Sequence, residues 1–312
     1  MGNLSTPKGM NLGKLVEQYG SEEQCRTALE ALRWPAGIVC PKCERKGASW
    51  LAKRRQHECN DRSCGYQFMV RAGTVLQDSK LPLWKWFMAT FLMCESKKGI
   101  SANQLRRMIG STYRTSWFLS QRIREAMSAA ANTEPLTGTV EMDETYIGGK
   151  RRFRKHGKRG WDRKSKTMVL GAVERGGDIR LAVEHRNAGM GPFYQFATKH
   201  IDDKAPAIYT DDHSGYAVFG DADTKHESVN HSAEEWVRGD VHTNTIESAW
   251  SLFKRSIVGS YHHLNVKYMD KYLDEFEWRY NNRHNEFLFR DTMKALVGAD
   301  TMTYKALTSR SA

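Results

Sequence analysis

A chain of 312 residues is long enough for two or three domains, and its 40% hydrophobic and 11% aromatic residues allow it to bury a core. This composition excludes an intrinsically disordered chain. The net charge of +12 at pH 7 favours a polyanionic partner, nucleic acid before membrane, although charge alone also fits an ordinary basic protein.

Residues 1–20 contain no continuous apolar stretch, so we expect no secretory signal. The most apolar window, Leu81–Cys94, is short and includes Lys85, which favours a buried helix over a membrane span. We therefore expect a cytoplasmic protein without membrane contact. Six cysteines in a reducing compartment indicate metal binding or free thiols rather than disulfides. Cys25 and Cys94 stand alone in the sequence and are predicted to be packing residues.

Four cysteines form two pairs, Cys40-x2-Cys43 and Cys59-x4-Cys64, a spacing that supplies four thiolates to one tetrahedral zinc ion. A site closed by four protein ligands leaves no position for a substrate. The predicted zinc is therefore structural and stabilises a module too small for a core of its own. His57 lies close to Cys59 and is an alternative ligand, and four buried free thiols are the less favoured interpretation.

Residues 100–127 have the pattern of a helix-turn-helix. Ser101 is predicted to cap the first helix, Gly110 to form the turn and Thr112 to begin the second helix. On the second helix, Arg114 and Arg122 are candidate DNA-contacting residues. The periodicity alone fits an ordinary helical hairpin equally well.

The pattern changes after Pro135 and Gly138. Strands are predicted at 139–146, 166–174, 178–184 and 207–210, with a turn at Gly176-Gly177. Helices are predicted at 191–201 and from about Asn244 and Val266. This order indicates an α/β domain with a mixed sheet.

Two of these strands carry acids. Val140 and Met142 are predicted to face one side of the first strand, and Glu141 and Asp143 the other. A carboxylate within a sheet is costly unless it binds a metal or a partner. Asp211 ends a second apolar strand in the same way. Oxygen ligands from two strands suit Mg²⁺, and two such ions can clamp the attacking and leaving oxygens of a phosphoryl displacement.

A third acid, Glu247, lies on the predicted helix that begins near Asn244. Glu247 is at the edge of the buried stripe formed by Ile246, Ala249, Trp250, Phe253 and Ile257. Lys254, seven residues later, shares its face and is placed to contact a DNA phosphate. Asn244-x-x-Glu247 is also a capping-box pattern, so the alternative is that Glu247 only caps its helix.

These motifs extend over nearly the whole chain. They are Arg33-Trp34-Pro35 before Cys40-Pro41-x-Cys43, Gly73-Thr74-Val75, residues 100–127, Met142–Gly149, Tyr209–Asp211, and Asn244–Ser248 with Lys254-Arg255. In order and combination they resemble the zinc-ribbon DDE transposases of bacterial insertion sequences.

The resemblance implies a multidomain α+β protein. An N-terminal helix and zinc ribbon would occupy residues 1–78, a helix-turn-helix-like region 79–132, and an RNase H-like catalytic domain with a mixed α/β sheet 135–300. It also implies that Asp143, Asp211 and Glu247 form a catalytic triad that holds two Mg²⁺ or Mn²⁺ ions. Asp212 directly follows Asp211 and is the alternative second ligand.

The implied function is that of a DNA transposase, which binds element ends and catalyses strand cleavage and strand transfer as a homo-oligomer on nucleoid DNA. A basic insert after Gly149 includes Arg151, Arg152 and Lys155, which we expect to contact phosphates rather than form only a solvated loop. Two alternatives are a zinc-ribbon DNA-binding regulator with an inactive nuclease core, and a metal-dependent nuclease that hydrolyses DNA without strand transfer.

Overall fold

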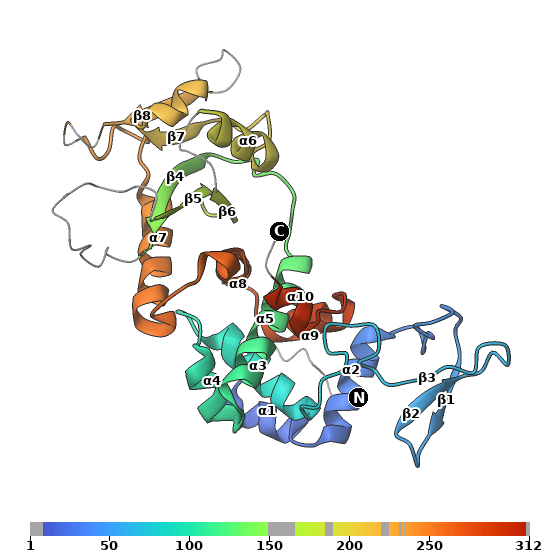
Figure 1. Ribbon diagram of the computed structural model, residues 1–312. Coiled ribbons are helices and arrows are strands. Elements are labelled where there is room, and N and C mark those ends of the chain that lie inside the picture. Colours follow the sequence, from blue (N-terminus) through green and yellow to red (C-terminus); the bar gives the residue numbers. More distant parts are fainter. Residues whose placement is uncertain are drawn as a thin grey trace. The chain divides into compact units, whose positions relative to one another are not determined.

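The computed structural model describes residues 9–148, 166–184, 190–219, 225–230, 233 and 235–309 (Figure 1). The chain divides into two compact units, one formed by Met1–Ala131 with His284–Ala312 and the other by Asn132–Arg283. The C-terminal segment thus belongs to the first unit, whereas the sequence assigned residues up to 300 to the catalytic domain. Among the described helices, none combines the length and hydropathy that a membrane crossing requires.

The first unit is mainly helical. Its helices are α1 (Leu12–Tyr19), α2 (Glu22–Arg33), α3 (Leu83–Glu95), α4 (Ala102–Ile109), α5 (Tyr113–Ala129), α9 (Leu288–Gly298) and α10 (Tyr304–Thr308). Helix α3 is buried as expected, with Trp86, Phe87 and Met93 almost fully enclosed. Helix α9 joins this unit because it packs against α2, α3 and α5. Its apolar face, which includes Phe289 and Met293, supplies part of the core.

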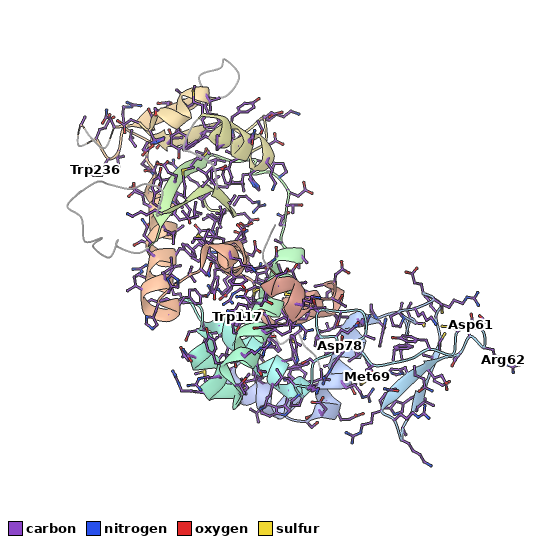
Figure 2. The ribbon with its side chains drawn as sticks, in the orientation of Figure 1. Asp61, Arg62, Met69, Asp78, Trp117 and Trp236 are labelled. Carbon is purple, nitrogen blue, oxygen red and sulfur yellow. The ribbon has the colours of Figure 1, made fainter. Side chains whose placement is uncertain are left out.

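A small antiparallel sheet follows α2. It consists of β1 (Ala48–Leu51), β2 (Gln56–Cys59) and β3 (Gln67–Phe68), with β2 in the middle. The second cysteine pair consists of Cys59, the last residue of β2, and Cys64 in the loop between β2 and β3, and Figure 2 shows Asp61 and Arg62 at the outer end of this loop. Strands β1 and β2 were not predicted from the sequence, because each is only four residues long.

The two helices predicted around Gly110 are present as α4 and α5, an arrangement that fits a helix-turn-helix and an ordinary helical hairpin alike. The Ser101 hydroxyl accepts a hydrogen bond from the Gln104 N–H and caps α4. Gly110 adopts a left-handed φ of 59°, which ends α4 and which a residue without a side chain adopts readily. The Thr112 hydroxyl then caps α5 by accepting from the Thr115 N–H.

The second unit is built on a five-stranded mixed sheet. Its strands are β4 (Val140–Ile147), β5 (Thr167–Glu174), β6 (Ile179–Glu184), β7 (Ile208–Asp211) and β8 (His226–Val229). They lie in the order β6-β5-β4-β7-β8. The first three are antiparallel, while β7 and β8 run parallel to β4. This is the mixed sheet of the RNase H-like fold expected from the sequence, and its strand β8 was not predicted.

Helices cover both faces of this sheet (Figure 1). Helix α6 (Met190–His200) packs on the face that carries Val140 and Met142. Helices α7 (Asn244–Ser256) and α8 (Met269–Asn281) pack on the opposite face. The predicted division of the first strand into two faces is therefore confirmed.

Helices α7 and α8 are fixed on the sheet by specific contacts. A side chain on Gly171 of β5 would approach the Trp250 ring within 2.6 Å, so this glycine allows α7 to lie close to the strand. On α8, the Asn281 amide bonds both the N–H and the carbonyl of Ile179 on the edge strand β6. Covering the polar groups of an edge strand in this way protects it from pairing with other chains.

Candidate catalytic site and zinc centre

Asp143, Glu144 and Asp211 lie together in the second unit, with one oxygen atom from each carboxylate within 4.8 Å of the others. The sheet register produces this arrangement. Glu141 on β4 pairs with Tyr209 on the parallel strand β7, and Asp143 and Asp211 each follow two residues later on the same face. Glu144 reaches the cluster from the opposite face of β4, where the Tyr216 hydroxyl donates to it at 3.0 Å.

The electrostatics of the cluster favour binding of a cation. Burial raises the pKa of Asp143 to about 8, well above its ordinary value. The neighbouring charges of Glu144, Asp211 and Glu247 act in the same direction. Burial and the charge of Asp211 also raise the pKa of Glu144. Several oxygen ligands whose negative charges oppose one another suit a hard divalent ion such as Mg²⁺.

The geometry distinguishes the two adjacent aspartates. Asp211 ends β7, accepts a hydrogen bond from the His213 N–H at 3.0 Å and belongs to the cluster. Asp212 follows the strand and is exposed. The structure therefore favours Asp211 over Asp212 as the second acid of the site.

Glu247 lies on the first turns of α7. Among the described residues, the close cluster contains Asp143, Glu144 and Asp211 and does not include Glu247. Its charge nevertheless acts on Asp143, and its carboxylate accepts from the Thr243 hydroxyl at 2.9 Å. Because Thr243 is the N-cap, Glu247 is the fourth helical residue, one position beyond that required by the capping box. Lys254 is exposed on the same helix.

Two residues near the cluster were not identified from the sequence as site residues. Glu144 was passed over because strand alternation points it away from Asp143. Glu141 was noted only as a costly buried acid, and it is fully buried against the N-terminus of α7. The signal for Glu141 was the cost of burying a carboxylate without a partner.

Cys40, Cys43, Cys59 and Cys64 form the second cluster, with their four sulfur atoms within 4.8 Å of one another. The Cys40 and Cys64 sulfurs are 3.9 Å apart and those of Cys43 and Cys59 are 3.6 Å apart. A tetrahedral zinc site with Zn–S bonds of about 2.3 Å requires sulfur separations of about 3.8 Å. The four thiolates therefore fit a zinc ion.

The lone cysteines and the alternative zinc ligand have other partners. The His57 Nε2 atom lies 2.9 Å from a carboxylate oxygen of Glu30, and among the described residues the metal-binding cluster consists of the four cysteines without His57. Cys25 is buried, and its thiol donates to the Tyr19 carbonyl. Cys94 is also buried, with its sulfur 3.3 Å from the Thr292 hydroxyl.

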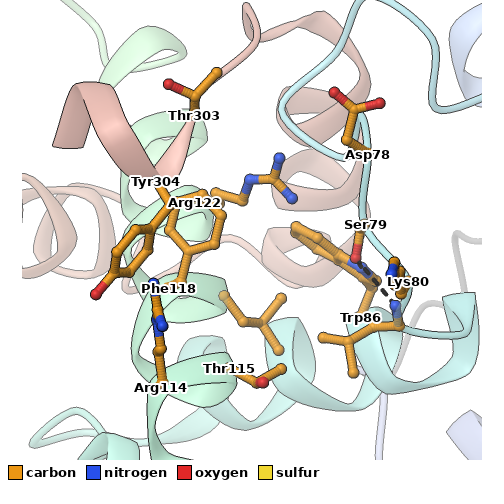
Figure 3. A pocket seen from close by; sticks show the side chains of 12 residues that line it. Asp78, Ser79, Lys80, Trp86, Arg114, Thr115, Phe118, Arg122, Thr303 and Tyr304 are labelled. Carbon is orange, nitrogen blue, oxygen red and sulfur yellow. Dashed lines mark hydrogen bonds between the residues drawn. The ribbon is translucent and has the colours of Figure 1, made fainter. Parts of the chain in front are cut away.

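The candidate DNA-contacting arginines of α5 have different environments. Arg114 is exposed on the first turn, with its guanidinium 4.2 Å from the centre of the Tyr304 ring. Arg122 is only 6% exposed and donates to the carbonyls of Gln77 and Met302. Both line a cavity of about 830 Å³ that is also bordered by residues 78–81, Trp86 and Tyr304, and Figure 3 shows their side chains around it. Arg122 therefore stabilises the first unit, which corrects its predicted DNA contact. The residues Arg151, Arg152 and Lys155 lie outside the described residues.

Comparison with known proteins agrees with this architecture. Residues 135–281 match the ISXO2-like transposase domain, and residues 20–67 match the transposase zinc-ribbon domain. The chain carries the zinc-ribbon and DDE domains of an insertion-sequence transposase. It is also similar to an uncharacterized protein in transposable element ISH50 of Halobacterium salinarum. The identity is 28% over 255 residues, which cover 77% of this chain and 84% of that protein.

The resemblance to zinc-ribbon DDE transposases is therefore confirmed. The DDE match spans the mixed sheet with its acidic cluster and continues through α7 to the end of α8. The zinc-ribbon match contains all four clustered cysteines.

We predict that the transposase carries about one zinc ion per chain, because four ligands close a structural site. Cys40→Ser or Cys64→Ser should lose the zinc and lower the melting temperature of the ribbon. Elemental analysis and thermal unfolding measure both effects. Cys94→Ser is the control and should retain the zinc. Zinc-free protein from a purification without chelator would contradict the prediction.

We further predict that the acidic cluster binds Mg²⁺ more tightly as the pH rises. Binding displaces the proton of Asp143, so the apparent affinity should increase up to tenfold per unit until about pH 8. In the metal-free protein the folded state holds this proton up to a higher pH than the unfolded chain. The stability that the bound proton gives to the folded state is therefore lost as the pH rises towards 8. Melting temperatures with and without Mg²⁺ between about pH 6 and 9 measure both trends. Asp143→Asn should remove both pH dependences. If Mg²⁺ raises the melting temperature of the parent protein by the same amount at every pH, the prediction is contradicted.

Proposed function

We propose that this transposase binds the ends of its element and catalyses metal-dependent DNA strand cleavage followed by strand transfer. The observation that carries the proposal is the cluster of Asp143 with Asp211 on adjacent parallel strands, inside a domain that matches DDE transposases. The raised pKa of Asp143 supports it, because a site that concentrates negative charge is suited to holding cations.

Each acid has a proposed role. The charges of Asp211 and Glu247 both act on Asp143, so Asp143 would hold both divalent ions. Asp211 and Glu247 would each favour one ion. Two Mg²⁺ or Mn²⁺ ions, when bound, supply activation of the attacking oxygen and stabilisation of the leaving oxygen. Lys254, exposed on the same helix as Glu247, would orient the DNA by contacting a phosphate.

DNA binding is proposed for the helix-turn-helix and the basic insert. Thr112, Tyr113 and Arg114 are exposed at the start of α5, the part of a recognition helix that meets base edges. Arg106 and Arg107 are exposed on α4 and are available for phosphates. The insert with Arg151, Arg152 and Lys155 would add contacts near the catalytic domain. A homo-oligomer would hold both element ends at once.

We predict that Asp143→Asn, Asp211→Asn and Glu247→Gln abolish cleavage and spare DNA binding. Each change removes a charged ligand, so the loss should exceed the roughly 100-fold cost of an outer partner. The assay incubates the protein with the DNA ends that flank its gene, together with Mg²⁺, and detects nicked and joined products. Asp212→Asn is the matched control and should remain active.

The same assay separates the alternatives. Joined products indicate a transposase, nicked products without joining indicate a hydrolytic nuclease, and DNA binding without either indicates an inactive regulator. A folded and active Glu247→Gln protein would overturn the assignment of the third acid and leave Asn244 or His242 as candidates.

DNA binding across a salt series should separate the basic residues. Neutralising Arg151, Arg152 and Lys155 should reduce the salt slope by about 0.9 for each phosphate that these side chains bind. Arg114→Ala should lower the preference for element ends by about 1–3 kcal/mol, because it removes a hydrogen-bonding group that faces the bases. Arg122→Ala should lower the melting temperature and keep the salt slope, since Arg122 is buried. An unchanged slope after neutralising the insert would refute its role.

A further inference from the structure

Glu141 connects the strand that carries Asp143 to the helix that carries Glu247. Its side chain is fully buried on the same face of β4 as Asp143. One carboxylate oxygen accepts from the N–H groups of Thr245 at 2.7 Å and Ile246 at 3.1 Å, and the other accepts from the Thr245 hydroxyl at 2.9 Å. The first N–H groups of a helix have no partner within the helix, and a carboxylate is well suited to satisfy them.

Arg175, directly after β5, completes this connection. Its Nε atom donates to Glu141 at 2.7 Å and compensates the buried charge. Its Nη2 atom donates to the carbonyl of His242 at 3.1 Å and lies 3.0 Å from the Nδ1 atom of that residue. The segment that enters α7 is therefore held by β4 through Glu141 and by the end of β5 through Arg175.

We propose that Glu141 is a positioning residue that fixes Glu247 relative to Asp143. Glu247 directly follows Ile246, whose N–H is bonded by Glu141, and Asp143 is two residues from Glu141 on one strand. The helix turn and the strand are both rigid, so the bonds of Glu141 set the distance between the two acids. This inference rests on the proposed function, in which Glu247 serves the site together with Asp143.

The chemistry of the contact supports positioning rather than packing alone. Apolar packing holds α7 close to the sheet but has no preferred direction, so it does not by itself orient the first turn of the helix. Hydrogen bonds to a charged carboxylate are short and directional, and three of them converge on one end of α7. Outer groups that orient ligands in this way typically change metal affinity or activity by 10–100-fold when they are removed.

The test uses Glu141→Gln in the full-length protein, with Mn²⁺ as the probe. Glutamine has a similar shape, but an NH₂ group replaces one carboxylate oxygen and accepts no hydrogen bond. The side chain therefore cannot accept from the N–H groups of α7 and from Arg175 at the same time. We expect Mn²⁺ affinity, measured by electron paramagnetic resonance titration, to fall about 10–100-fold. Mg²⁺-dependent cleavage should fall in parallel, while DNA affinity stays unchanged.

Glu277→Gln is the matched control. Glu277 is a largely buried carboxylate of α8 that accepts from the Leu181 N–H at 3.0 Å and so fixes a different helix to the same sheet. Its substitution should perturb stability and leave Mn²⁺ affinity within about twofold of the parent. Thermal unfolding establishes that each variant is folded at the temperature of the titration. If both variants lose the same Mn²⁺ affinity, the effect of Glu141→Gln comes from lower overall stability, and the inference is overturned.

A double variant tests whether Glu141 acts through Glu247. In a Glu247→Gln background, Glu141→Gln should cause no further loss of Mn²⁺ affinity, because the residue it positions no longer serves as a ligand. The inference is overturned if the losses of Mn²⁺ affinity from the two substitutions are fully additive. It is also overturned if folded Glu141→Gln protein binds Mn²⁺ as tightly as the parent, or if Glu247→Gln alone leaves the Mn²⁺ affinity unchanged. If the parent binds Mn²⁺ yet produces no nicked or joined DNA, the proposed function fails while the Mn²⁺ affinities still decide the role of Glu141.

Discussion

Repulsion between carboxylates held close together is the constraint on which the second unit depends. Oxygen atoms of Asp143, Glu144 and Asp211 lie within 4.8 Å, and partial burial prevents water from screening their charges fully. Such an arrangement persists only if the surrounding fold determines it. The parallel pairing of β4 with β7 does so, because the register that buries Val140 beside Ile208 also carries Asp143 to Asp211.

The cluster differs from the other buried acids of the same unit in how its charge is compensated. Glu141 is bonded by Arg175 and by the N-terminus of α7, and Glu277 accepts from a strand N–H near Arg180. The charges that act on Asp143 are instead those of further acids. The fold thus compensates the charges of Glu141 and Glu277 and gathers further negative charges around Asp143. A cation from solution is therefore bound most favourably at this cluster.

Much of this site follows from the sequence through periodicity. Alternation along β4 separated Asp143 from the residues that face α6, and the apolar stripe of α7 placed Glu247 at the edge of its buried face. The hairpin at Gly176 and the two cysteine pairs were also predicted, since turn residues and paired thiols are local signals. These features depend on neighbours in sequence, which a pattern records directly.

The remaining features depend on contacts between distant segments. Strand β8 has a polar sequence in which Val229 alone is fully buried, so it becomes a strand only by pairing with β7. Glu144 joins the cluster because Tyr216, 72 residues away, holds it there. Helix α9 lies next to the catalytic domain in sequence and packs in the first unit, because its apolar face meets α3 and α5. Periodicity identifies an apolar face but not the partner that covers it.

Burial also decides what the arginines of α5 do. Arg114 and Arg122 lie two turns apart on one helix, and their sequence contexts give no reason to separate them. Packing against α9 and the C-terminal segment buries the second half of α5, so Arg122 is left to satisfy the carbonyls of Gln77 and Met302. A buried guanidinium that bonds two loops stabilises the unit and is unavailable to DNA. Any contact of α5 with DNA bases is thereby confined to its exposed first turn, the part of a helix-turn-helix that enters the groove. In this turn the Thr112 cap fixes the start of the helix, and the Tyr304 ring holds the Arg114 guanidinium.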